Sequence, residues 1–369
     1  MASGNNDLKN VALPSAWDAA ELRRLQLRDG TTYESVIRDI NDALGIANGS
    51  LTGGYLGGLF SLTTDIAVEY RDGFSTGFED HTEYSQPDPK RADTSGHMLP
   101  IKKVDRKLGW TKDFLEEARR AKIDADIASV VQDAKDSFEK AVLTRLFKYE
   151  EETGRQYGLG ASGYSVPFVD GGGQTIDFTP LPRPDRMINT FSTSHTHYLR
   201  LSGITQANLE TAVDHIWEHG HDGPYELIIS NTDVAAWQTV ANVTGFVKRA
   251  DPLIQYGSST DLAGVGDVYI GGVQTKRGFC RMYANGRIPT TYWAVTKTYG
   301  ANDQRNPLKV RYDDMYGFGA KLEVNSIALY PLTGAVATMK FGVGVGMDRT
   351  AAVLVENDSS GSYGTPTIS

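Results

Sequence analysis

The most constraining feature of this sequence is a long stretch from Trp110 to Glu152 that contains neither glycine nor proline. Apolar residues recur in it every three or four positions, which is typical of a helix with one buried face. Thr111 is a suitable N-cap, and Gly154 provides a stop. We therefore predict one helix over residues 111–152. At about 1.5 Å per residue it would be roughly 60 Å long, several times the length of an ordinary globular helix.

A helix of this length needs either a coiled-coil partner or a flat molecule that lies along it. The apolar positions drift between spacings of three and four and form no clean heptads, which favours the flat molecule. These positions are Phe114, Ala118, Ile123, Ile127, Val130, Ala134, Phe138, Ala141 and Leu146.

Composition excludes several classes of protein. The chain has 369 residues and a net charge of −9, which argues against tight sequence-independent binding of nucleic acid but allows a protein that encloses DNA without gripping it. Cys280 is the only cysteine, so no intrachain disulfide can form. The polar start at Met1–Asn10 does not resemble a signal peptide, and no run of 18 apolar residues predicts a membrane span.

Residues 1–62 read as an arm rather than a domain. Short helices are expected at 18–27 and 31–44, followed by a glycine-rich strap over 49–58. Such a segment cannot bury its own apolar residues, so it is either a flexible terminus or an arm that lies against another part of the fold or another subunit. The candidate subunit contacts in it are Tyr55, Leu59 and Phe60.

Residues 63–110 read as an extended loop of two strands. Ile66, Val68 and Tyr70 alternate with polar residues, and the segment from Val104 to Trp110 offers a returning strand. The polar stretch between them is longer than most loops inside compact domains. The segment is either a solvated face or a projecting finger whose basic base meets an acidic neighbour. The candidate contacts are Phe74, Phe78, Lys102, Lys103, Arg106 and Lys107.

The remaining chain divides by pattern. Residues 205–304 alternate helical and strand signals and form an α+β module, whereas 305–356 carry alternating strands. Residues 357–369 are rich in serine and glycine and predict a flexible tail.

One string of residues has a catalytic spacing. His215, Glu218 and His219 form H-x-x-E-H, in which two histidines on one helical face bind zinc and the glutamate acts as base. The alternative is a structural helix, because it ends at Gly220 and no third ligand follows. The glycine runs lack a phosphate-binding spacing, so the sequence assigns no catalytic residue, metal or cofactor.

The order of these segments resembles the tailed-phage major capsid proteins, whose Hong Kong phage fold is shared with encapsulin shells. Arm, two-stranded projection, long helix, inserted α+β module and returning sheet follow one another as in that family. Four local stretches are also similar to a subfamily of these proteins: Ser194–Tyr198, His215–Gly220, Leu227–Asn231 and Arg349–Val353.

The resemblance implies an α+β capsid fold with defined parts. These are an N-arm over 1–62, an extended loop over 63–110, a peripheral domain over 111–204 and 305–356 with the spine helix at 111–152, and an axial domain over 205–304. The implied function is a structural one, without enzymatic activity. Copies of the chain would assemble in the host cytoplasm into hexamers and pentamers of an icosahedral head, which becomes part of the virion.

The resemblance also implies partners. These are other copies of the chain, double-stranded DNA enclosed without sequence-specific binding, a portal, and either a scaffolding protein or a maturation protease. It allows for decoration proteins and involves no membrane. Two alternatives stay open: an encapsulin-like cellular compartment, and a zinc hydrolase that uses the His215–His219 helix.

Overall fold

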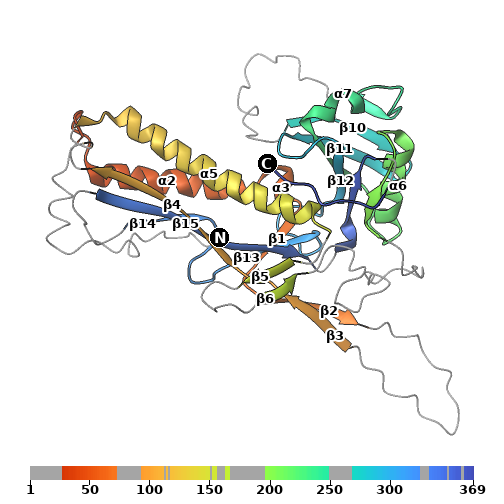
Figure 1. Ribbon diagram of the computed structural model, residues 1–369, viewed down its shortest axis with the longest axis horizontal. Coiled ribbons are helices and arrows are strands. Elements are labelled where there is room, and N and C mark those ends of the chain that lie inside the picture. The colour runs from red at the N-terminus through yellow and green to blue at the C-terminus, as the bar shows by residue number, and fades with distance from the viewer. Residues whose placement is uncertain are drawn as a thin grey trace, which may run out of the picture. The chain divides into compact units, whose positions relative to one another are not determined.

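A computed structural model gives the fold of the chain and describes the following residues: 27–72, 93–111, 114, 117–149, 152–155, 163–166, 196–248, 268–324, 332–346, 349–358 and 361–369. These residues form two compact units, which are described separately (Figure 1). The first unit comprises Met1–Thr52, Ile101–Glu139 and Tyr312–Phe341. The second comprises Gly53–Pro100, Lys140–Arg311 and Gly342–Ser369.

In the first unit, three antiparallel strands of a five-stranded sheet carry helices. β15 (Leu332–Val345) pairs on one edge with β4 (Lys102–Thr111) and on the other with β14 (Ala320–Val324). Side chains alternate between the two faces of a strand, so Ala337, Met339 and Phe341 share one face, where they are buried. The ring of Phe138 from helix α5 (Arg120–Phe147) lies 5.3 Å from the ring of Phe341.

Helix α2 (Tyr33–Leu51) confirms the helix expected at 31–44 and extends it by almost two turns. Thr32 is the N-cap, and its side-chain oxygen accepts a hydrogen bond from the Ser35 amide. The apolar residues at helical spacing are buried in the chain itself, and the helix contacts β14. They are Val36, Ile40, Leu44, Ala47 and Leu51. This part of the predicted arm therefore lies against its own fold. The helix expected at 18–27 falls almost wholly outside the described residues.

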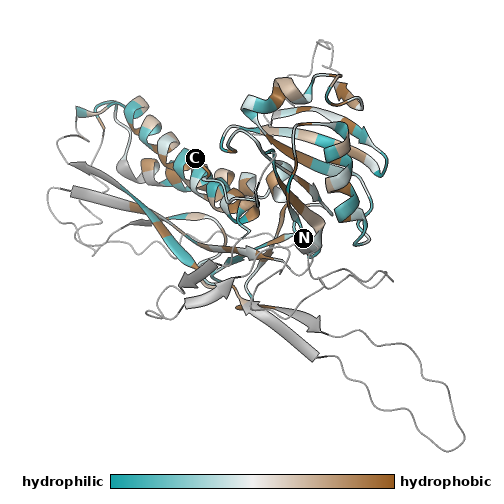
Figure 2. Ribbon diagram, turned by 45° about the vertical axis from the view of Figure 1, so that its right-hand side comes forward, coloured by the Kyte–Doolittle hydropathy of each residue, from teal (hydrophilic) through white to brown (hydrophobic). Residues whose placement is uncertain are grey.

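The long helix is shorter than predicted. Helix α5 spans Arg120–Phe147, which is 28 residues or about 42 Å rather than 60 Å. It begins at Arg120 because the side-chain oxygen of Asp29 accepts the Arg120 amide hydrogen at 3.0 Å and so acts as a cap. Ala118 uses its carbonyl to accept the Arg28 amide at 3.3 Å, and Thr111 ends strand β4 instead of starting the helix. The prediction over 111–152 was wrong at both ends, since Thr111 belongs to β4 and Glu152 begins strand β5 (Glu152–Arg155). At the N-terminal end, the contacts that set the start of the helix come from remote parts of the chain. Along α5, apolar positions alternate with polar ones (Figure 2).

The second unit is built on a seven-stranded sheet with the order β7-β16-β12-β8-β11-β10-β9. Pairing is antiparallel except between β8 and β11 and between β7 and β16. The strands are β7 (Tyr198–Arg200), β8 (Tyr225–Ser230), β9 (Phe246–Lys248), β10 (Val268–Thr275), β11 (Gly278–Asn285), β12 (Tyr292–Lys297) and β16 (Ala352–Glu356).

Helix α6 (Gln206–Trp217) packs on one face of this sheet, and Thr205 is its N-cap. It agrees with the helical signals expected in the α+β module over 205–304. Its buried residues share one core with Tyr225, Leu227 and Ile229 of β8. The predicted domain boundary is wrong here, since β16 was assigned to the peripheral part and yet pairs with β12 in this sheet. Short helical turns complete the unit at η2 (Asn231–Asp233), α7 (Val234–Trp237) and η3 (Arg349–Ala351).

The segment after α2 lies against the other face of the same sheet. Its short helix α3 (Gly54–Gly57) places Tyr55 over Tyr283 of β11, with ring centres 5.2 Å apart. The Asn285 amide donates a hydrogen bond of 2.6 Å to the Tyr55 hydroxyl. Strand β1 (Phe60–Thr63) then pairs in parallel with β13 (Leu308–Tyr312).

The extended loop also differs from its prediction. β2 (Ala67–Asp72) pairs with β3 (Asp93–Met98), so the returning strand lies earlier than the one expected at 104–110. That later segment is β4 of the first unit. A second small ribbon pairs β5 (Glu152–Arg155) with β6 (Gly163–Val166).

The C-terminal segment also differs from its prediction as a flexible tail. Tyr363 is 4% exposed and Ile368 is 3% exposed, so the segment 361–369 is packed on the second unit and is not a flexible tail. Serine and glycine content alone misled the prediction, because these two apolar side chains provide burial that composition does not reveal.

A single asparagine joins α2 to the sheet of the first unit. The Asn48 side-chain amide donates to the Ala320 carbonyl and accepts from the Ala320 amide, both at 2.8 Å. Asn48 lies so close that a Cβ atom at Gly319, where φ is +98°, would come within 2.3 Å of it.

We predict that Asn48→Ala lowers the free energy of unfolding by about 1–3 kcal/mol, because two backbone groups of Ala320 lose their partner. Urea denaturation followed by circular dichroism measures the change. The matched control is Asn41→Ala on the same helix, which should cost less than about 0.5 kcal/mol. Equal losses in the two variants would contradict this role of Asn48.

Candidate functional site

Three histidines lie together in the second unit. The ring of His197 is 4.7 Å from that of His219 and 6.0 Å from that of His215, centre to centre. His197 and His219 are fully buried. The His197 Nδ1 atom donates a hydrogen bond of 2.9 Å to the Ala352 carbonyl, and His215 hydrogen-bonds the backbone of Thr196. The group thus joins the start of β7 to α6 and β16.

The observed contacts of this group are with backbone groups and among the histidine rings themselves. In the described part of the chain, no three His, Cys, Asp or Glu side chains are placed to hold a metal ion. His221 uses both ring nitrogens, at 2.6 Å from the Tyr299 hydroxyl and 2.7 Å from the Thr350 hydroxyl. Among the described residues, His197, His215 and His219 are therefore not placed as a metal site, which leaves the H-x-x-E-H zinc hypothesis without support there.

Cys280 does not have the properties of a nucleophile. It lies within the core between α6 and the sheet, and burial raises the pKa of its thiol to about 12. A thiol with that pKa stays protonated near neutral pH and is not reactive. Its packing role agrees with its place in strand β11.

The basic residues expected at the base of the finger lie on strand β4 of the first unit. Arg106 forms an ion pair with Asp133 of α5, and its guanidinium also donates to the Ser129 hydroxyl at 3.0 Å. Lys103 is 3.6 Å from Asp105 on its own strand. These residues therefore lie on a strand that pairs with β15. Their contact with an acidic neighbouring subunit stays a prediction. Lys102 and Lys107 are exposed on this strand.

The apolar contact residues of the arm are also placed differently from their prediction. Tyr55, Leu59 and Phe60 are 2%, 0% and 1% exposed within the single chain. They do not need a second subunit for burial, because α3 and β1 pack on the second unit. Phe74 and Phe78 lie outside the described residues.

Other apolar side chains are exposed and were missed by the sequence reading. In the first unit, Ile46 is 78% exposed and Met315 is 97% exposed. In the second unit, Val240 is 66% exposed and Val247 is 53% exposed. Exposed apolar side chains of this kind are candidates for contacts with other molecules, although single ones also occur on ordinary surfaces. The periodicity of the sequence could not reveal this exposure. It predicts which face of a helix or strand is apolar, but not whether another element covers that face.

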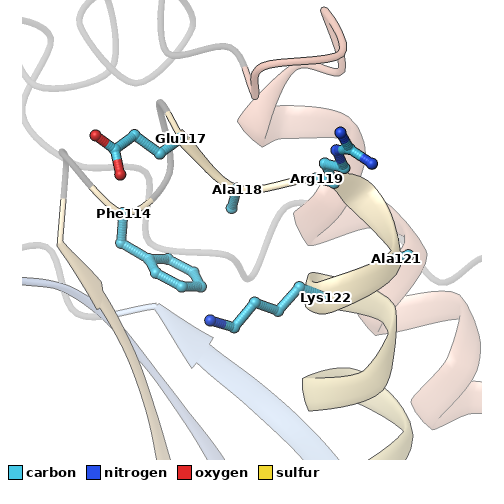
Figure 3. A pocket seen from close by; sticks show the side chains of 6 residues that line it. All are labelled: Phe114, Glu117, Ala118, Arg119, Ala121 and Lys122. Carbon is cyan, nitrogen blue, oxygen red and sulfur yellow. The ribbon is translucent and has the colours of Figure 1, made fainter.

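An open pocket of about 470 Å³ lies where the chain enters α5. Its lining residues are Phe114, Glu117, Ala118, Arg119, Ala121 and Lys122. Figure 3 shows the Lys122 side chain directed toward the Phe114 ring, with the ammonium 4.6 Å from the ring centre. The lining combines one aromatic ring with side chains of both charges, Glu117 on one hand and Arg119 and Lys122 on the other. The apolar periodicity predicted one continuous helix that includes Phe114 and Lys122, and so gave no sign of this pocket.

The described helices include none that is both long and apolar enough to span a membrane.

Comparison with solved structures identifies the fold to which the chain is similar. Neither a family model nor a curated protein sequence matches the chain. A solved structure from Mycobacterium phage Patience matches with a TM-score of 0.62 and 19% identity, over 93% of each chain. Weaker likenesses include the capsid structure of Cyanophage P-SCSP1u, with a TM-score of 0.45 and 13% identity over 82% of this chain and 87% of that one. The holo-SrpI encapsulin complex from Synechococcus elongatus PCC 7942 has a TM-score of 0.43 and 11% identity, over 85% of this chain and 90% of that one.

The chain is therefore an α+β protein with the fold of phage major capsid proteins. The order of elements predicted from the sequence agrees with this fold, although several boundaries between its parts do not.

We predict that acid destabilises the second unit through His215. Burial lowers the pKa of this side chain in the folded state, against the opposing charges of Glu218 and Asp214. Because the unfolded chain binds the proton more readily, this stabilisation is complete above pH 6.5 and is lost as the pH falls toward the folded-state pKa.

Urea denaturation from pH 7 to pH 5 measures this effect. In His215→Gln, the decrease in unfolding free energy should be smaller than in the unmodified chain, by at most about 1.4 kcal/mol per pH unit. An identical pH dependence in the two proteins would exclude His215 as the responsible group.

Proposed function

We propose that the chain is the major capsid protein of a tailed bacteriophage. Copies of it form hexamers and pentamers, and these build an icosahedral head around double-stranded DNA. The observation that carries this proposal is the likeness of fold to the phage structure over 93% of both chains. A match of that extent leaves no large part of the chain for an unrelated domain.

The surface chemistry is compatible with a subunit of a shell. Exposed apolar side chains occur in both units, at Ile46 and Met315 in one and at Val240 and Val247 in the other. Contacts on several sides let each copy meet more than one neighbour, and many modest interfaces add up in a closed assembly. The net charge of −9 suits a wall that encloses DNA without binding it tightly.

The proposal also includes location and partners. The chain would assemble in the host cytoplasm and remain in the virion as a structural protein without catalytic activity. A portal protein would close one vertex, and a scaffolding protein or a maturation protease would direct assembly. Decoration proteins would bind only after a shell exists.

An encapsulin-like compartment is the alternative within the same fold. It differs from a phage head in its contents, which would be a cargo protein rather than DNA.

We expect the purified protein at high concentration to form closed icosahedral particles, visible by negative-stain electron microscopy. For particles isolated from the natural source, nuclease treatment after opening distinguishes enclosed DNA from a protein cargo. A protein that stays monomeric at every concentration and salt condition would contradict a shell function of either kind.

A second expected outcome concerns the segment between β2 and β3, which contains Phe74 and Phe78. Deleting residues 74–91 keeps both strands of the ribbon and removes the sequence expected to reach a neighbouring copy. The variant should remain folded by circular dichroism and form monomers or capsomers without closed particles. Normal particles from this variant, imaged beside the full chain, would show that the segment is not needed for assembly.

A further inference from the structure

Three histidine rings lie together between strand β7 and helix α6. His197 comes just before β7, and the ring centres of His219 and His215 lie 4.7 and 6.0 Å from its own. His197 and His219 are fully buried, and His215 is half-buried. Since a histidine side chain ordinarily titrates at about pH 6.5, such a group can gain more than one positive charge within a narrow range of mild acid.

Neutral rings suit this site better than charged ones. The Nδ1 atom of His197 faces a carbonyl oxygen, which only accepts hydrogen bonds, so Nδ1 carries the hydrogen of the neutral ring. Protonation would therefore add a hydrogen at Nε2, an atom enclosed by protein. A charge there loses the solvation of water, and a second charge on His219 at 4.7 Å would repel the first.

The acidic residues of α6 oppose this effect without cancelling it. Glu218 and Asp214 favour a positive charge on His215, yet burial has the larger influence and lowers the pKa of this ring. Asp214 also has a second partner, because its carboxylate lies 2.7 Å from the Arg277 guanidinium. The least buried of the three rings thus already favours its neutral form.

In the described part of the chain, the other elements around the rings present apolar or neutral groups. On the sheet side of α6, Tyr225 and Cys280 stay neutral, because burial raises the pKa of both side chains. Strand β16 contributes the apolar residues 352–355. His221 is hydrogen-bonded to two hydroxyl groups. A positive charge in these surroundings is costly.

Strand β7 is the element that such charges would release. It is three residues long, lies at the edge of the described sheet and pairs there with β16 alone. At its start, the Leu354 amide donates a hydrogen bond of 2.8 Å to the His197 carbonyl, and the His197 ring donates one of 2.9 Å to the Ala352 carbonyl. Movement of this short segment would bring the ring into water.

The far end of β7 is held by interactions that persist in mild acid. Arg200 forms ion pairs with Glu356 and Asp358, and the Leu201 amide donates a hydrogen bond of 3.0 Å to the Glu356 carbonyl. Carboxylates ordinarily become protonated only about two pH units below the range in which histidines titrate. Opening in that range is therefore confined to the end that carries His197.

We propose that His197, His215 and His219 form a pH-sensitive latch, which holds the start of β7 on β16 near neutral pH and releases it in mild acid. A released ring binds a proton as readily as in an unfolded chain, whereas the enclosed rings resist it. The latch is therefore closed above about pH 6.5 and opens as the pH falls. Release exposes the edge of β16 at Leu354. The latch lies within one chain, so the inference does not depend on the proposed phage head.

Hydrogen exchange of single amides in the full chain tests the latch, with each rate corrected for the intrinsic effect of pH. Protection of the Leu354 amide should fall by about tenfold between pH 7 and pH 5, the factor that corresponds to one unit of histidine pKa. Successive amides of a strand point to opposite edges, so the Val355 amide points to β12 and serves as the internal control. Its protection should change by less than about threefold, because β12 stays paired.

Matched variants test whether the histidines are responsible. His219→Gln removes the charge nearest to His197, so it should keep most of the Leu354 protection at pH 5. His97→Gln, in strand β3, is the control and should behave like the unmodified chain. Circular dichroism at pH 7 shows whether each variant is folded, and His215→Gln replaces His219→Gln if the latter is not.

Three results would overturn the proposal. Protection of Leu354 that does not change with pH would show that no release occurs. An equal loss at Leu354 and Val355 would show unfolding of the whole sheet instead of a local opening. The same loss in a folded histidine variant as in the unmodified chain would show that the rings do not control the strand. The first two results come from the unmodified chain, so they decide even if both variants fail to fold.

Discussion

The pairing of β15 with β4 is the interaction on which the first unit depends. These strands lie more than 200 residues apart in the sequence, and their register runs from Leu332 opposite Thr111 to Phe341 opposite Lys102. The same strand pairs with β14 on its other edge and so creates the buried face that α2 and α5 cover. Closing so long a segment of chain has an entropic cost, which the burial of that face offsets.

The second unit also depends on pairing between strands that are remote in sequence. β16 arrives near the end of the chain and fits between β12 and β7, where all five of its residues are buried. The arm reaches the opposite face of the sheet through Tyr55, and the tail reaches its edge through Tyr363. The segment around Tyr55 and the segment 361–369 each include a buried tyrosine whose hydroxyl takes part in a hydrogen bond. In each case the partner is a part of the same chain that lies far away in sequence.

The polar side chains of the described residues mainly join elements of the chain to one another. The histidines join elements through backbone hydrogen bonds, and the cysteine is buried and protonated. Among the charged side chains expected to form an intersubunit patch, Arg106 forms an ion pair with Asp133 of its own chain. The surface also presents single apolar residues and an open pocket before α5. These features suit a protein that contacts other copies of itself.

The sequence by itself determined the elements that local forces decide. α6 with its Thr205 cap, strand β8 and most of α2 were predictable, because periodicity and capping act within a few residues. The order of segments was enough to suggest the capsid fold. Only the tertiary structure decided where α5 begins, which sheet β16 joins, and that Tyr55 and Tyr363 are buried in their own chain. Each of these depends on a remote partner, such as the Asp29 carboxylate or the Phe147 carbonyl, and local sequence carries no record of which remote segments will meet.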